Sequence, residues 1–164
     1  MSENSAVSGN GSVIQAIFAD VDHGSILSPE GAITITVGIP LWLQGYAYDL
    51  EDGILLDAAL HWSSSRDGDL GTGSQALVSL SLGRHTVTFT ATDSDANTAT
   101  ATAQVLVTFP EDIVPDCQID AADLQALTDR WRQAAGLPYD LDGDGQVTVA
   151  DILRVSAAWG NACP

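Results

Sequence analysis

The sequence contains no lysine. Its five basic residues, all arginines, stand against 22 aspartates and glutamates, so the net charge is −17 at pH 7. Without lysine the chain lacks the amine that forms Schiff bases and isopeptide bonds. Nucleic acids and anionic membranes are bound by basic surfaces, so both are disfavoured as partners. The many carboxylates instead suit hard cations, above all Ca²⁺.

Long apolar runs are also absent from the sequence, and its first residues do not have the pattern of a signal peptide. No segment approaches the roughly 18 consecutive apolar residues of a membrane-spanning helix. Residues 1–12 have neither the basic nor the apolar region of a signal peptide, so we predict a flexible linker there and a secretion signal outside this chain. Hydrophobic residues make up 45% of the sequence, enough for a packed core, so the acidity does not indicate disorder.

The first part of the sequence has the pattern of short strands. Ala32–Val37 alternates apolar residues with threonine, as a half-buried strand does. Turn residues separate it from the other predicted strands, which are Val13–Phe18, Leu41–Tyr48, Leu60–Ser64, Ala76–Leu80, Thr86–Ala91 and Thr98–Phe109. Short strands without a helical period predict an all-β antiparallel sandwich over residues 13–110, with Trp62 beside its core.

Segments 45–53, 60–65 and 83–95 resemble bacterial Ig-like, PKD-like and cadherin-like extracellular modules. The resemblance implies a spacer, an adhesin or a carbohydrate-contacting unit. In that topology the acidic turns share one end of the sandwich, where they gather Asp49, Glu51, Asp52, Asp93 and Asp95. These carboxylates either bind a second Ca²⁺ or cap the backbone of ordinary turns.

The pattern changes at Pro110, and an internal repeat follows. Residues 116–131 align with residues 144–159, and each copy reads as a loop followed by a helix. Each helix carries a matching apolar stripe, made of Ile119, Leu124, Leu127 and Trp131 in the first copy and of Val147, Ile152, Val155 and Trp159 in the second. We therefore predict a second, small all-α domain over residues 111–164, in which the two stripes pack together.

The second loop, residues 140–151, has the pattern of a calcium loop of the EF-hand type. Positions 1, 3, 5, 7, 9 and 12 of the loop are Asp140, Asp142, Asp144, Gln146, Thr148 and Asp151. A hard cation takes six to eight oxygen ligands, which these carboxylates, one backbone carbonyl and one hydroxyl supply. Gly145 at position 6 permits the left-handed backbone that the turn requires. The alternative is an acidic turn without a metal.

The first loop, residues 112–123, departs from this pattern. Its residues at the ligand positions that remain are Asp112, Asp116, Gln118, Asp120 and Asp123. Position 3 is Val114, and the glycine position is Cys117, where a positive φ is costly. The loop either holds an ion with water completing the shell or only scaffolds the second loop.

Two Asp-rich loop–helix units without a preceding helix resemble a dockerin domain. The resemblance implies a calcium-dependent, non-catalytic extracellular or cell-surface module that binds a cohesin-type protein partner. It implies a partner-binding surface at loop positions 10 and 11, which are Ala121, Ala122, Val149 and Ala150 here. In an extracellular setting, a Cys117–Cys163 disulfide would join the first loop to the end of the module, whereas a reducing compartment would leave two thiols.

Catalysis has little support in the sequence. His23, His61 and His85 are scattered and accompany no nucleophile motif. Trp42, Tyr46 and Tyr48 would suit a sugar platform, but their alternate spacing favours a core. We therefore expect a non-enzymatic spacer plus attachment module. The alternative is a structural subunit of a surface layer or fibre, which self-assembles through strand addition and calcium-stabilised contacts.

Overall fold

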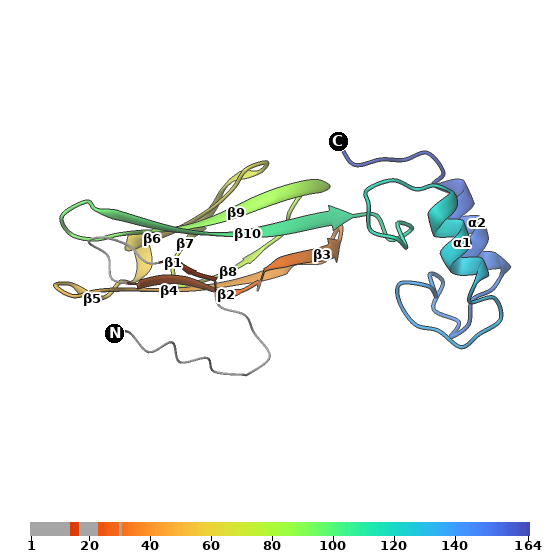
Figure 1. The fold of residues 1–164 in the computed structure, drawn as a ribbon, viewed down its shortest axis with the longest axis horizontal. Coiled ribbons are helices and arrows are strands. Elements are labelled where there is room, and N and C mark those ends of the chain that lie inside the picture. The colour runs from red at the N-terminus through yellow and green to blue at the C-terminus, as the bar shows by residue number, and fades with distance from the viewer. Residues whose placement is uncertain (1–13, 17–22, 30) are drawn as a thin grey trace. The chain divides into compact units, whose positions relative to one another are not determined.

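The computed structural model describes residues 14–16, 23–29 and 31–164. The predicted linker over residues 1–12 lies outside the described residues, as does Val13–Phe18 apart from β1. In the described residues, strands form two five-stranded sheets (Figure 1). One sheet holds β1 (Ile14–Ala16), β2 (His23–Ser28), β4 (Leu41–Asp49), β5 (Gly53–Ile54) and β8 (Gln75–Val78). The other holds β3 (Ala32–Thr36), β6 (Leu60–Ser64), β7 (Gly68–Thr72), β9 (Gly83–Thr92) and β10 (Thr98–Thr108).

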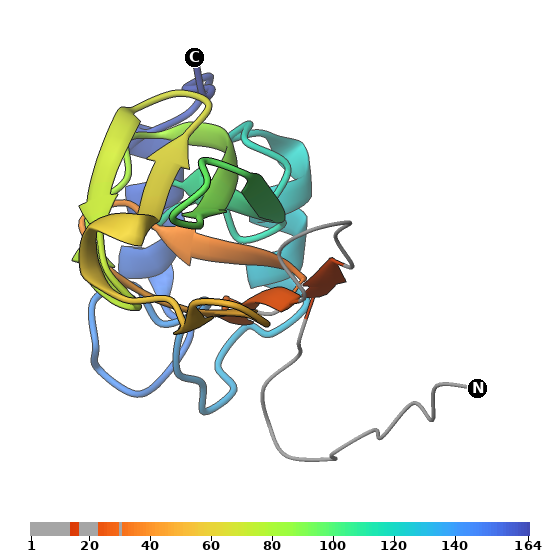
Figure 2. The same cartoon turned by 90° about the vertical axis from the view of Figure 1, so that its left-hand side faces the viewer.

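The two sheets form the layers of a β-sandwich, as Figure 2 shows along the strands. This confirms the predicted sandwich. Trp62 is fully buried, as predicted, and its ring lies 4.5 Å from that of Phe89, centroid to centroid. Gly45 is required beside this pair, because a Cβ built there would lie 2.7 Å from the Phe89 ring.

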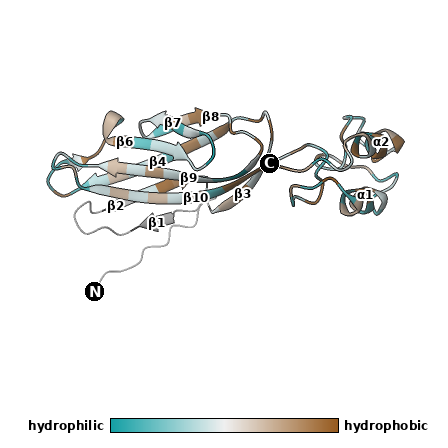
Figure 3. Cartoon of the chain, turned by 90° about the horizontal axis from the view of Figure 1, so that it is seen from above, coloured by the Kyte–Doolittle hydropathy of each residue, from teal (hydrophilic) through white to brown (hydrophobic). Residues whose placement is uncertain are grey.

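Strand β4 alternates between a buried and an outward side, and Figure 3 shows alternating hydropathy along the strands. Leu41 and Leu43 point inward and are buried. Trp42 and Tyr46 point outward and are 47% and 41% exposed, so the expectation that they belong to the core is wrong. An alternating pattern shows which residues share a face, but it does not show which face is buried.

The prediction of a separate all-α domain is wrong. The helices in this part of the chain are short: α1 (Ala121–Thr128) has eight residues and α2 (Val149–Ala157) has nine. Most of the rest of residues 111–164 is loop and turn. The compact unit that contains the helices also includes strand residues, since it comprises Thr34–Ile39, Leu80–Arg84 and Leu106–Pro164. Of the other described residues, a single turn of 3₁₀-helix (Asp57–Ala59) is the remaining helical element.

The helices are short because each is bounded at both ends. Asp120 and Thr148 cap the N-termini through side-chain bonds to the backbone. Beyond the C-cap residues Asp129 and Ala158 the chain leaves the helical direction, and Arg132 and Gly160 take positive φ angles of 61° and 81°. Trp131 and Trp159, which the repeat places on the apolar stripes, therefore lie beyond the helices.

Helices this short need tertiary contacts to persist. A buried cluster supplies them, and it combines residues of both repeats: Ile113, Ile119, Leu127, Val147 and Val155. The predicted contact between the two stripes is thus present in its buried members.

Candidate metal centre

The second loop folds around the carboxylate of Asp140. This buried side chain accepts hydrogen bonds from the backbone N–H groups of Gly143 (2.7 Å), Gly145 (2.8 Å) and Asp144 (3.1 Å). Gly145 has a φ of 88°, a conformation that glycine adopts without the cost that a side chain adds. The chain therefore curls around a carboxylate and presents the following acidic side chains to one side.

Three carboxylates converge in this loop. One oxygen each from Asp140, Asp142 and Asp144 lies within 4.8 Å of the other two. Across the described part of the chain, this is the one group of three acidic, histidine or cysteine side chains that meets such a distance. Asp142 and Asp144 are exposed, so their carboxylates are accessible to a cation from solvent. Their oxygens are the ligand type that Ca²⁺ prefers.

Asp151 closes the loop from the first turn of α2. Its buried carboxylate accepts the N–H groups of Leu141 (2.7 Å) and Thr148 (2.7 Å), and more weakly that of Asp142 (3.3 Å). Burial raises the pKa of Asp151, but these backbone donors outweigh it and hold the pKa below its usual value. Asp151 is therefore an anion that ties the two ends of the loop together.

The other two predicted ligands of this loop, Gln146 and Thr148, carry no carboxylate and make hydrogen bonds within the loop and the helix. Gln146 is exposed, and its N–H bonds to the Asp144 carboxylate at 2.8 Å. The Thr148 hydroxyl accepts the N–H of Ala150 at 3.2 Å, so it acts as the helix cap.

The pKa of Asp142 is raised above its usual value. The N–H of Asp144 lowers this pKa, but desolvation and the charges of Asp144 and Asp151 raise it more. A cation bound here would relieve this concentration of like charge.

The first loop repeats this backbone framework. Asp112 accepts the N–H groups of Cys117 (2.9 Å) and Asp116 (3.3 Å), as Asp140 does in the second loop. Asp123 accepts those of Val114 (2.9 Å) and Asp120 (2.8 Å), as Asp151 does. Cys117 has a φ of 73°, the conformation of the equivalent Gly145.

The side chains of the first loop are arranged otherwise. Its predicted ligands Asp112, Asp116, Asp120 and Asp123 do not form a converging group among the described residues. Val114 stands at position 3, where the second loop has a carboxylate, and Asp112 bonds to the Thr108 hydroxyl. Burial raises the pKa of Asp112 despite these hydrogen bonds. The exposed Gln118 donates its N–H to Asp116 at 2.8 Å.

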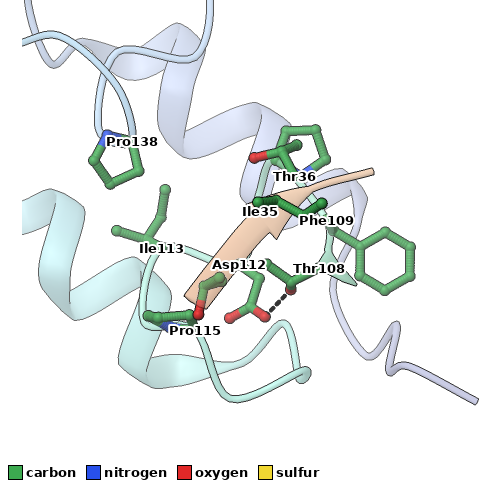
Figure 4. A pocket seen from close by; sticks show the side chains of 10 residues that line it. Ile35, Thr36, Thr108, Phe109, Asp112, Ile113, Pro115 and Pro138 are labelled. Atoms are coloured by element: carbon green, nitrogen blue, oxygen red, sulfur yellow. Dashed lines mark hydrogen bonds between the residues drawn. The ribbon is translucent and has the colours of Figure 1, made fainter. Parts of the chain in front are cut away.

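A small cavity of about 250 Å³ lies beside Asp112 (Figure 4). Ile35, Phe109, Ile113 and Pro115 line it together with threonines of β3 and β10. Its lining is mainly apolar, and Asp112 is its only acidic residue. The cavity therefore adds no further metal ligands to the first loop.

Each loop pairs with the segment after the other helix. Gln118 bridges to Ala162, and Gln146 bridges to Ala134. A backbone hydrogen bond lies beside each bridge. Cys163 donates its N–H to the carbonyl of Cys117 at 3.0 Å, and Ala135 donates its N–H to the carbonyl of Gly145 at 3.1 Å. The two repeats are therefore interlocked.

The predicted Cys117–Cys163 disulfide is confirmed, with a Cα–Cα distance of 5.2 Å. It reinforces one of these two equivalent contacts, while the other, between Ala135 and Gly145, has no covalent link. The bond joins the first loop to the segment after α2. The sequence repeat places Cys163 opposite Ala135, but only the pairing of the folded segments explains why the bond forms there.

The predicted partner-contacting residues lie at the starts of the two helices. Ala121 and Ala122 are exposed on α1, whereas Ala150 of α2 is half-buried. Val149 and Leu153, one helical turn apart on α2, are 59% and 62% exposed.

Among the described residues, no helix has the length and apolar character needed to cross a membrane.

The acidic turns of the sandwich lie next to each other. Asp52 accepts both the N–H (2.7 Å) and the hydroxyl (2.9 Å) of Ser94. The buried Asp49 accepts the N–H groups of Glu51 and Asp52, each at 2.8 Å.

Asp93 accepts the N–H groups of Asp95 (2.9 Å) and Asn97 (2.8 Å). A side-chain hydrogen bond from Asn97 lowers the pKa of Asp93. The carboxylates of Asp49, Asp52 and Asp93 thus cap the turns, and no three carboxylates of this region converge among the described residues.

Sequence reasoning missed a buried pair in the sandwich. The Ser64 hydroxyl lies 2.8 Å from Nδ1 of His85, and the Asp67 carboxylate lies 3.7 Å from the same nitrogen. A serine–histidine–aspartate relay needs the serine and the aspartate on opposite ring nitrogens, so these three residues are not arranged as such a relay.

The other two histidines are placed apart from this pair. His61 pairs with Asp69 at 3.1 Å on the surface, and the side chain of His23 lies outside the described residues.

No family model matches the sequence, and no curated protein matches it. The features that bear on function are therefore those of the loops themselves.

Proposed function

We propose that this chain is a non-catalytic, calcium-binding attachment module that works outside the cell. The sandwich acts as a spacer, and the loop–helix repeat contacts a protein partner of the cohesin type. The observation that carries the proposal is the convergence of Asp140, Asp142 and Asp144 in a loop whose backbone is already closed.

The closed backbone supports calcium binding because it lowers the ordering cost of the site. Asp140 and Asp151 hold the two ends of the loop through backbone N–H groups. Ca²⁺ would take oxygens from Asp140, Asp142, Asp144 and Asp151, with the Gln146 carbonyl and either Thr148 or water completing the shell. In this role the ion neutralises carboxylates that otherwise repel one another.

We assign one ion to the second loop and a scaffolding role to the first. The first loop has the same backbone but lacks the carboxylate at position 3. The disulfide at Cys117 holds this loop covalently, as the ion would hold the second loop. A disulfide is also consistent with an oxidising, extracellular environment.

Calorimetric titration of the demetallated chain with Ca²⁺ tests the metal assignment. We expect one site in the wild type and none in Asp144→Ala, with Asp116→Ala, its equivalent in the first loop, as the matched control. Two sites would overturn the scaffolding role of the first loop. No binding would overturn the proposal. Growth into large species on adding Ca²⁺, detected by sizing, would favour a surface-layer or fibre subunit.

The attachment role rests on the exposed apolar side chains of α2. Val149 and Leu153 lie on one side of the helix that begins at the metal loop. A cohesin domain should bind in Ca²⁺ and dissociate in chelator. Val149→Asp and Leu153→Asp should weaken binding at least tenfold, whereas Leu137→Asp, an exposed apolar residue outside the helices, should not. Equal effects of all three changes would contradict this surface.

A further inference from the structure

The outward side of β4 presents a row of aromatic rings. Trp42 and Tyr46 are 47% and 41% exposed, and Tyr48 is half-buried at the next outward position. The inward positions of the strand carry Leu41, Leu43, Gly45 and Ala47, and the strand ends at the buried Asp49. The core between the two sheets is therefore formed without these rings, and core packing does not explain why aromatic residues stand at these positions.

Neighbouring strands widen this row into a surface. Leu77 of β8 pairs directly with Trp42, and Ile54 of β5 pairs with Tyr48. Residues directly opposite each other in an antiparallel pair lie on the same face. The side chains of Leu77 and Ile54 are each more than half exposed. Rings and apolar side chains thus extend along one face of the sheet.

Amide side chains lie within the same surface. Gln44 sits between Trp42 and Tyr46 on the outward side of β4, and Gln75 of β8 is its cross-strand partner. Amides both donate and accept hydrogen bonds, so this pair suits a ligand that carries hydroxyl groups. The named outward positions hold no charged residue.

These features select the chemistry of the ligand. A pyranose ring presents C–H groups on its face, which pack on the negative face of an aromatic ring, while its hydroxyls point sideways to polar groups. Trp42 and Tyr46 are four residues apart, about 13 Å along the strand, so they can contact different sugar units of one chain. The net charge of −17 disfavours a polyanionic glycan or a nucleic acid.

We propose that the face formed by Trp42, Gln44, Tyr46, Gln75 and Leu77 binds a neutral polysaccharide laid along β4. This site is separate from the calcium loop, so the two proposals can fail independently. The sandwich then holds a surface glycan while the loop–helix repeat holds a protein.

Affinity electrophoresis and calorimetry with soluble hydroxyethyl cellulose, a neutral polymer, test this site. Trp42→Ala and Tyr46→Ala should each weaken binding roughly tenfold, in line with the loss of one stacked ring. Trp131→Ala is the matched control, because Trp131 is 44% exposed and lies in the other compact unit. Chelation of Ca²⁺ should leave the affinity unchanged.

Three outcomes would overturn the proposal. The first is equal weakening by Trp42→Ala and Trp131→Ala, which would show that the polymer binds exposed rings indiscriminately. The second is the absence of binding to hydroxyethyl cellulose and to soluble xylan and mannan. The third is concentration-dependent dimerisation that Trp42→Ala abolishes, because a second copy of the chain would then cover the face.

Discussion

The two loops of the repeat adopt the same backbone but differ in the side chains they present. Asp112 and Asp140 each accept the N–H at position 6 of their loop, at 2.9 and 2.8 Å. Asp123 and Asp151 each accept the N–H at position 9, at 2.8 and 2.7 Å. The first and last carboxylates therefore determine the loop fold. The middle positions decide whether acidic groups converge.

Position 6 of the first loop holds a cysteine where the second loop has a glycine. Cys117 takes the left-handed backbone of Gly145, which costs about 1–2 kcal/mol for a residue with a side chain. The disulfide to Cys163 offsets that cost by holding the segment in place. Under the proposed function, one loop is held by a covalent bond and the other by an ion.

Removing the disulfide should have the largest effect on this comparison. The bond spans a sequence separation of 46 residues, so its loss from Cys117→Ala/Cys163→Ala should destabilise the fold by about 4 kcal/mol. Urea unfolding without calcium measures the change. A loss below about 1 kcal/mol would show that the interlocked backbone holds the first loop by itself.

Converting the second loop toward the first should have the next largest effect. Asp142→Val copies Val114 at position 3, and we expect calcium affinity to fall roughly 100-fold because one carboxylate is lost. Calorimetry measures the affinity, and Val114→Ala serves as the control without effect. Unchanged affinity in Asp142→Val would show that position 3 does not contribute to the site.

Exchanging residues at position 6 should reveal the backbone cost directly. In a Cys163→Ala background, Cys117→Gly should be about 1.5 kcal/mol more stable than Cys117→Ala. Gly145→Ala should lose a similar amount, since a Cβ there meets no atom within 4 Å and only the positive φ opposes it. Urea midpoints compare Cys117→Gly with Cys117→Ala in that background, and Gly145→Ala with the wild type. An unchanged midpoint in both comparisons would contradict the shared conformation.

The helix caps should give the smallest difference. Asp120→Ala and Thr148→Ala should each cost about 1 kcal/mol, because both side chains bond the N–H two residues later. Thermal unfolding measures both. A cost confined to one variant would show that the equivalent caps do not contribute equally.

Much of the fold was predictable because its signals are local. Alternation predicted β1, β3, β4, β6, β8, β9 and β10, but it did not predict β2, β5 and β7, two of which lie in or beside segments expected to be turns. The buried Trp62 was placed correctly. The Asp pattern predicted the second loop, and the three acids at positions 1, 3 and 5 do converge. The all-α domain was wrong because the spacing of Trp131 and Trp159 extends each apolar stripe past the true helix end.

The sequence by itself determined the strand pattern, the two related loops and the pair of cysteines available for a disulfide, because each depends on neighbouring residues and on spacing. Only the tertiary structure decided that each loop pairs with the segment after the other helix. It also decided that Trp42 and Tyr46 face outward, because Gly45 on the other side of β4 makes room for the Phe89 ring. Which face of an alternating strand is buried depends on the sheet that packs against it.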